Sequence, residues 1–161
     1  MSVPRVAREQ PVKVLRGQAA RHHTRSPATT ASRTDLRVVV VDGYVPSARR
    51  LDRGSRAAHL YHGQIRSWVA SRGWRVGQMF DESSLQTALE RVESRESDGL
   101  IVARFSHLGS SLADALAAIE RIQAAGGRFA SVADGIDLDT PTGRLLLRLL
   151  LSVVHQNQER G

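Results

Sequence analysis

The chain has 161 residues, of which 41% are hydrophobic, so it is long enough to bury one core and form one domain. No apolar run is long enough to span a membrane, and the first residues do not resemble a secretory signal. Because the chain has no cysteine, disulfides and thiolate metal sites are excluded. We therefore expect a cytoplasmic protein without membrane association, cofactor or metal.

The positive charge is concentrated at the beginning of the chain. Residues 1–34 carry seven cationic side chains and one acidic side chain, which accounts for +6 of the net charge of +7. Residues 26–32 are rich in Ser, Thr, Pro and Ala, and such a segment buries too little apolar surface to offset its ordering entropy. We predict a disordered basic tail, and such a tail can hold DNA through phosphate contacts. The interpretation that we prefer is a solvated or mis-annotated start, because nearly all cations of this chain are arginines.

From residue 35 onward, strand-like patterns alternate with helical patterns along the chain. Strands are expected over residues 37–41, 74–80, 100–103 and 128–133, and helices over 55–72, 84–96, about 111–125, and from 141 to at least 154. The strands are runs of β-branched and other apolar residues, which are typical of strands buried on both faces of a parallel sheet. Residues 35–161 are thus predicted to form a three-layer α/β domain with a mostly parallel sheet, helices on both faces and a long C-terminal helix.

Residues with special backbone preferences mark the ends of these elements. Gly73 and the pair Gly126-Gly127 predict helix ends, and Thr140 followed by Pro141 predicts an N-cap and a first-turn proline. Asp42-Gly43 predicts a turn or bulge. Since no glycine-rich phosphate loop follows a strand, the pattern argues against a flavodoxin-like nucleotide-binding protein.

The last helix is apolar on nearly every side. Only Arg144, Arg148 and Ser152 form a polar strip among its leucines and valines. A helix of this kind must be covered on most sides, and a small domain covers only one face. We expect the helix over residues 141–158 to contact a second subunit.

Three segments resemble the catalytic domain of the serine recombinases, the resolvase/invertase family. They are residues 47–55, residues 100–114, which align without a gap, and the most specific match, Ile136-Asp137-Leu138-Asp139-Thr140-Pro141-Thr142-Gly143-Arg144. The resemblance covers about 125 residues. It implies a protein of site-specific DNA recombination, with a second copy or a recombinase-like protein as partner for the last helix.

The family's reaction, as the resemblance implies it, needs an activated serine and several arginines. A serine hydroxyl attacks a DNA phosphodiester to give a 5′-phosphoserine intermediate, and guanidinium groups stabilise the charge that develops on the phosphorane oxygens. Here the nucleophile position falls on Pro46 or Ser47 and the upstream arginine on Tyr44 or Val45. The family's aspartate and two further arginines are replaced by Ser106, His107 and Ser110.

These replacements give a short set of candidate site residues. Ser47 is the candidate nucleophile, and the candidate DNA-binding residues are Arg49, Arg50, Arg104, His107 and Arg144. Alternatively, Ser47 is a turn residue that follows a strand and His107 is a surface histidine.

We expect a catalytically inactive, oligomerising module that associates with DNA or with a recombinase; the alternative is an active strand-exchange enzyme that uses Ser47. Family members usually carry a DNA-binding domain after the long helix, and we expect none here, since the sequence given stops at Gly161. DNA binding is therefore expected to be weak, salt-sensitive and dependent on the tail.

Overall fold

The computed structural model describes residues 37–160 except 48, 50 and 52. The predictions for the tail, residues 1–34, lie outside the described residues. In the described part of the chain, no helix is both long and apolar enough to cross a membrane.

One five-stranded sheet organises the domain, with strand order β2-β1-β3-β4-β5. The first four strands are mutually parallel, and β5 is antiparallel to β4. The strands are β1 (Val40–Tyr44), β2 (Arg75–Phe80), β3 (Gly99–Val102), β4 (Arg128–Ser131) and β5 (Ile136–Asp137). The helices are α1 (Gly54–Ser71), α2 (Leu85–Glu93), α3 (Leu112–Ala124) and α4 (Pro141–Glu159), with short 3-10 helices η2 (Glu82–Ser84) and η3 (Phe105–Leu108).

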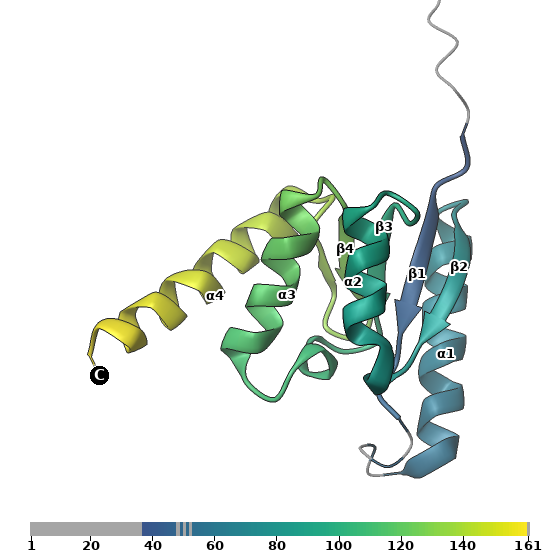
Figure 1. Ribbon diagram of the computed structural model, residues 1–161, viewed down its shortest axis with the longest axis horizontal. Helices are drawn as coiled ribbons and strands as arrows, with labels where there is room; N and C mark the ends of the chain where they lie inside the picture. Colours follow the sequence, from purple (N-terminus) through teal and green to yellow (C-terminus); the bar gives the residue numbers. More distant parts are fainter. Residues whose placement is uncertain (1–36, 48, 50, 52, 161) are drawn as a thin grey trace, which may run out of the picture. The chain divides into compact units, whose positions relative to one another are not determined.

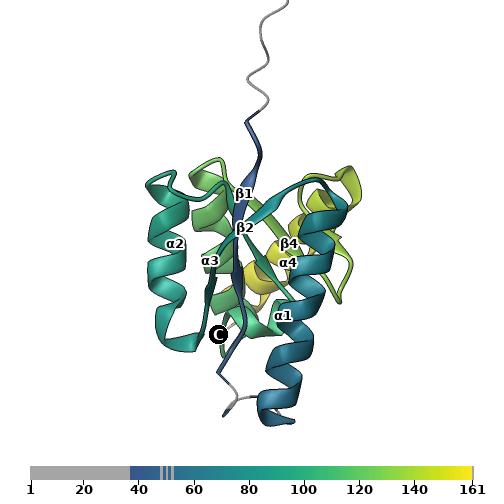
Figure 2. The ribbon, with the colours of Figure 1, turned by 90° about the vertical axis from the view of Figure 1, so that its right-hand side faces the viewer.

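The helices cover the sheet on both faces (Figures 1 and 2). On one face, α1 packs Ile65 and Val69 against Val41 of β1 and Ile101 of β3. On the other face, α2 and α3 bury their apolar stripes against the neighbouring positions of the same strands, because successive strand residues point to opposite sides. This arrangement confirms the predicted three-layer, mostly parallel α/β architecture.

Some element boundaries differ from the sequence prediction. β1 begins at Val40 rather than at residue 37, and Arg37 lies exposed, with its Nη2 2.5 Å from a carboxylate oxygen of Asp98. The helix expected over residues 84–96 ends at Glu93. The two-residue strand β5 was not predicted, since so short a segment has no periodicity to read.

The buried carboxylate of Asp42 in β1 joins this strand to β2 and to the helix α2. Asp42 is 0% exposed; its Oδ1 accepts a hydrogen bond of 2.8 Å from the backbone N–H of Gln78 in β2, and its Oδ2 accepts one of 2.9 Å from Nε of Arg91 in α2. The backbone N–H of Asp42 donates to Oγ of Ser97. The pairing of β1 with β2 shifts by one residue at Asp42, with the extra residue in β2, and Gly77 leaves the room that the carboxylate occupies. The turn or bulge expected at Asp42-Gly43 is thus a bulge of the partner strand, and both residues lie inside β1.

The beginning of α4 is fixed by the segment that resembles the recombinases most closely. Oγ1 of Thr140 accepts a hydrogen bond of 3.0 Å from the backbone N–H of Gly143, which confirms the predicted N-cap, and Pro141 occupies the first turn. A Cβ atom at Gly143 would overlap the carbonyl oxygen of Asp137, so only glycine allows the helix to start so close to β5.

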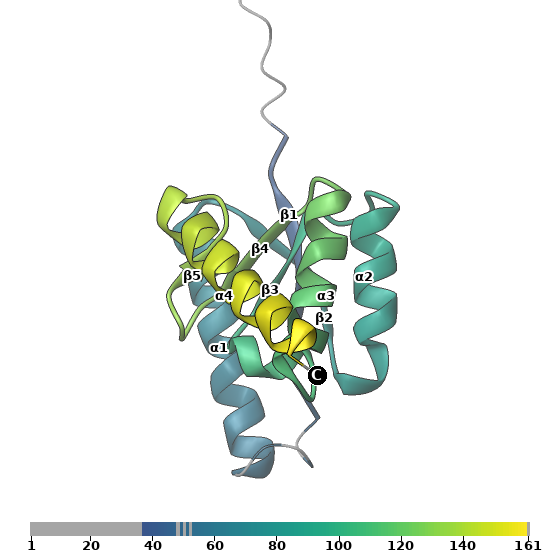
Figure 3. The ribbon, with the colours of Figure 1, turned by 90° about the vertical axis from the view of Figure 1, so that its left-hand side faces the viewer.

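Only part of the surface of α4 is covered by the domain. Leu147 is buried and Leu150, Leu151 and Val154 pack partly against the core. The large side chains that remain exposed on this helix are Leu145 (58%), Leu146 (37%), Leu149 (56%) and Val153 (48%). Figure 3 shows α4 lying across the domain beside α3, and in Figure 1 its C-terminal half extends past the sheet.

Replacement of Arg91 by methionine is expected to lower the free energy of unfolding by about 3 kcal/mol, because it leaves the fully buried Asp42 carboxylate without its cation. The measurement is urea denaturation followed by circular dichroism. Arg121→Met is the matched control, since Arg121 pairs with the exposed Glu93 and its loss should have a much smaller effect. Equal losses for the two variants would contradict the assignment of Asp42 as a buried charge that depends on Arg91.

Candidate functional site

An open cleft of about 690 Å³ lies beyond the carboxyl ends of β1 and β3. It is lined by Pro46, Leu51 and Arg53 after β1, by Ala57, Leu60, Tyr61 and Gln64 of α1, and by Arg104, Ser106 and His107 after β3. The chain leaves β1 toward the helix on one face of the sheet and leaves β3 toward the helices on the other face. Open α/β sheets bind their ligands at such a point, where neighbouring strands connect to opposite faces.

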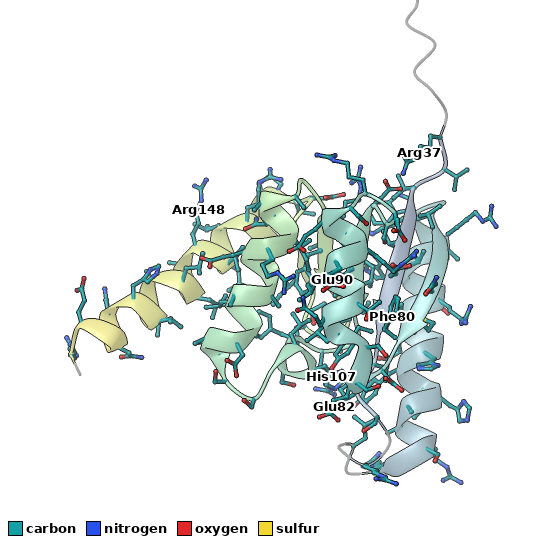
Figure 4. The ribbon with its side chains drawn as sticks, viewed as in Figure 1. Arg37, Phe80, Glu82, Glu90, His107 and Arg148 are labelled. Carbon is teal, nitrogen blue, oxygen red and sulfur yellow. The ribbon has the colours of Figure 1, made fainter. Side chains whose placement is uncertain are left out.

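Ser47, the candidate nucleophile, lies half-buried three residues after the end of β1. Its hydroxyl donates a hydrogen bond of 3.1 Å to Oε2 of Glu82 in η2. Figure 4 shows Glu82 and His107 at the end of the sheet where β1 ends. The carboxylate of Glu82 therefore lies beside the hydroxyl of the candidate nucleophile.

His107 lies in η3 and is a buried side chain, 9% exposed, rather than the surface histidine considered as an alternative. Its ring contacts the ring of Tyr61 edge-on, with 4.9 Å between centroids. Its Nδ1 is buried and has no hydrogen-bond partner among the described residues. Burial and the nearby Arg104 guanidinium lower the pKa of His107 to about 4, so the imidazole is neutral at pH 7 and supplies no positive charge in place of an arginine.

Two arginines of the described residues line the cleft, Arg53 and Arg104, and both are exposed. The guanidinium carbon of Arg104 lies 6.0 Å from the centroid of Tyr61. Arg49 is exposed and is not part of the cleft lining, and Arg50 lies outside the described residues. The sequence interpretation thus identified Arg104 and missed Arg53, although Arg53 follows Ser47 in the same loop.

Arg144 lies on the first turn of α4, and its hydrogen bonds go to backbone. Its Nη1 donates to the carbonyl oxygens of Leu138 and Asp139, at 3.0 and 3.1 Å. These bonds tie the loop after β5 to the helix. Arg144 is not part of the cleft lining, so the structure does not bring it together with Arg104 and His107.

The loop that carries Arg104 and His107 is hydrogen-bonded to Asp134, which follows the neighbouring strand β4. Oδ2 of Asp134, which follows β4, accepts hydrogen bonds of 2.5 Å from the backbone N–H of Phe105 and from Oγ of Ser131. At the other end of the loop, Ser111 and Asp114 form a capping box at the beginning of α3. The described residues contain no group of three or more His, Asp or Glu side chains that could hold a metal ion.

The sheet order and the site at the ends of β1 and β3 define a resolvase-like α/β domain. Residues 62–160 match the family model described as "Resolvase, N terminal domain", and the chain belongs to this family of serine recombinases. Comparison with curated proteins gives no match.

Solved structures with a similar fold come from the same family. The N-terminal catalytic domain of TP901-1 integrase aligns with 74% of this chain and 97% of its own, at 17% identity and a TM-score of 0.64. A resolvase family site-specific recombinase from Streptococcus pneumoniae aligns with 76% of this chain and 89% of its own, at 15% identity and a TM-score of 0.65. The C-terminal catalytic domain of ISC1926 TnpA, an IS607-like serine recombinase, aligns with 73% of this chain and 99% of its own, at 10% identity and a TM-score of 0.52. At these identities, the likeness shows the fold.

Acidification from pH 7 to pH 5 is expected to lower the free energy of unfolding through His107 by about 1–2 kcal/mol. The unfolded chain binds a proton at this imidazole below about pH 6.5, whereas the folded protein binds it only near pH 4. The protonation of His107 therefore leaves the free energy of unfolding unchanged above about pH 6.5 and lowers it as the pH falls from 6.5 to 4.

The measurement is urea denaturation at several pH values, comparing the wild type with His107→Gln. His155→Gln is the control, since His155 is exposed on α4. A pH dependence that is the same in the wild type and in His107→Gln would contradict the assignment.

Proposed function

We propose that this protein does not catalyse strand exchange and acts as an oligomerising module of the recombinase family that associates with DNA or with an active recombinase. The observation that carries the proposal is the surroundings of Ser47, whose hydroxyl donates to a carboxylate, Glu82. Two described guanidiniums line the nearby cleft, and neither is hydrogen-bonded to Ser47.

Transfer of a phosphoryl group to serine needs positive charge that converges on the reacting phosphorus. Each transition-state donor contributes a factor of roughly 10²–10³ in rate, so the loss of several arginines leaves little reaction. His107 does not compensate, because its lowered pKa keeps the ring neutral at pH 7. Glu82 adds a negative charge on the nucleophile's side. Both features support an inactive protein.

The exposed side of α4 supports self-association. Leu145, Leu149 and Val153 recur at intervals of four residues, are each about half exposed, and form one apolar stripe along the helix. An exposed stripe of this size is typical of a protein interface. Membership of the resolvase family supports contact with DNA in general. The tail expected to hold DNA lies outside the described residues, and its role is part of the proposal.

Incubation of the full chain with supercoiled DNA, followed by denaturing electrophoresis, is expected to give no protein–DNA adduct that depends on Ser47. Ser47→Ala is the matched control for attachment elsewhere. Glu82→Gln removes the opposing carboxylate and is also expected to give no adduct, because the missing arginines are not restored. An adduct in the wild type that disappears in Ser47→Ala would establish the alternative, an active enzyme with a 5′-phosphoserine intermediate.

Analytical ultracentrifugation at tens of micromolar is expected to show a dimer of the wild-type chain. The double variant Leu145→Gln/Leu149→Gln should dissociate at least roughly tenfold more readily, since it removes two apolar side chains from the interface centre. Arg148→Gln, on the same helix and exposed, is the control. A wild-type chain that remains monomeric at this concentration would refute self-association through α4.

A further inference from the structure

We propose that the C-terminal end of α1 is a latch, made of Trp68, Arg72 and Trp74, that fixes the start of α4. Arg72 is its positioning residue. The latch keeps the apolar stripe of α4 in the direction that self-association needs. This last step rests on the proposed function, whereas the latch itself is a set of contacts within one chain and is tested separately.

Two tryptophans hold Arg72 in the turn between α1 and β2. Arg72 is the C-cap residue of α1, and Gly73 follows it with a φ of 69°, so the chain turns sharply there. The guanidinium carbon of Arg72 lies 4.0 Å from the centroid of the Trp68 ring and 5.5 Å from that of Trp74. The two rings meet edge-on, with 5.8 Å between centroids. This aromatic surface limits the directions in which the planar fork of Arg72 can point.

The fork of Arg72 points at a buried carboxylate. Nη2 of Arg72 lies 2.5 Å from Oδ2 of Asp137 in β5, and Asp137 is 8% exposed. Because this Oδ2 accepts no hydrogen bond within the described residues, the contact is an ion pair rather than an aligned hydrogen bond. Removing one partner of a buried ion pair leaves an uncompensated charge, so the pair holds β5 against the end of α1. In Figure 2 the upper end of α1 lies beside the beginning of α4, as this contact requires.

Asp137 also builds the start of α4. Its backbone carbonyl oxygen accepts hydrogen bonds from the N–H and from Oγ1 of Thr140, at 3.1 and 2.7 Å. Its Oδ1 accepts a hydrogen bond of 2.9 Å from the N–H of Asp139. The backbone of Asp137 is also the surface against which Gly143 packs. The residue that Arg72 holds is therefore the residue on which the first turn of α4 rests.

A second arginine ties the same loop to the same tryptophan. Arg128 of β4 forms an ion pair with Asp139, and its guanidinium carbon lies 4.9 Å from the centroid of Trp74. Trp74 thus contacts the two arginines that hold residues 137–139. Both pairs lie on the segment that leads into α4, so the end of α1 and the start of β2 together fix where this helix begins.

The direction of α4 depends on its start because the domain covers little else of it. Leu147 is the one large side chain of this helix that is buried among the described residues, and the apolar stripe is about half exposed. A helix of 19 residues is about 28 Å long, so a rotation of about 5° at its start moves its far end by about 2.5 Å. Interface cores pack as densely as protein interiors and do not tolerate such a shift. The latch therefore decides whether two copies can align their stripes.

The test is hydrogen–deuterium exchange of the full chain, read by mass spectrometry on peptides that cover residues 144–150. Arg72→Gln is expected to speed exchange there at least roughly tenfold, because it leaves the carboxylate of Asp137 unpaired and loosens the loop before α4. Arg66→Gln is the matched control, since Arg66 is exposed on α1 and forms no ion pair with a carboxylate of the described residues. Equal exchange in the two variants overturns the latch.

A double variant keeps the test decisive if Arg72→Gln disturbs the fold more widely. Asp137→Asn removes the buried charge and keeps an oxygen for the N–H of Asp139, so Arg72→Gln/Asp137→Asn should exchange more slowly than Arg72→Gln alone. Purely additive effects would contradict the pair. Both tryptophans of the chain belong to the latch, so their emission should shift to longer wavelength in Arg72→Gln and stay unchanged in Arg66→Gln.

Sedimentation of the same variants tests the step from the latch to self-association. Arg72→Gln is expected to weaken the dimer at least roughly tenfold relative to Arg66→Gln, since α4 is no longer held in its binding direction. An unchanged dimer in a variant whose α4 exchanges fast would overturn this step. A monomeric wild type would refute the proposed self-association, and the exchange comparison would still decide whether the latch holds α4.

Discussion

The buried carboxylate of Asp42 determines how the two sides of the site meet. Its need for donors is met by the N–H of Gln78, which requires the bulge in β2, and by Arg91 of α2. After the bulge, Tyr44 pairs with Phe80, and the N–H of Val45 donates to the Phe80 carbonyl oxygen at 3.0 Å. The segments that follow β1 and β2 therefore leave the sheet side by side. This places the hydroxyl of Ser47 3.1 Å from a carboxylate oxygen of Glu82.

The layers of the domain could be predicted from the sequence, because buried strands and amphipathic helices have different periods and because Thr140-Pro141 marks a helix start. The pairing of Ser47 with Glu82 could not. These residues are 35 positions apart, and their contact depends on a one-residue shift between β1 and β2 that Asp42-Gly43 indicates without fixing its position or direction. The burial of His107 was missed for a similar reason, since it depends on Tyr61 of α1.

The segment that resembles the family most closely serves the scaffold rather than the chemistry. Thr140 caps α4, Gly143 permits its close approach to β5, and Arg144 binds the carbonyl oxygens of the preceding loop. All three requirements concern where the long helix starts and in which direction it runs. A match to the family in this segment therefore reports on how α4 is placed, and it says little about the residues of the reaction.

The cleft raises a related point, because binding an anion and transforming it need different arrangements of charge. Binding an anion in its ground state requires only that cations lie near it, and two exposed arginines, Arg53 and Arg104, line the cleft. Catalysis requires donors held in advance where charge develops, around the serine that attacks. His107 is neutral at pH 7 and the hydroxyl of Ser47 donates to the carboxylate of Glu82, so neither His107 nor Glu82 supplies a positive charge there. The proposal of an inactive protein rests on this difference between cations that line a cleft and donors that converge on a hydroxyl.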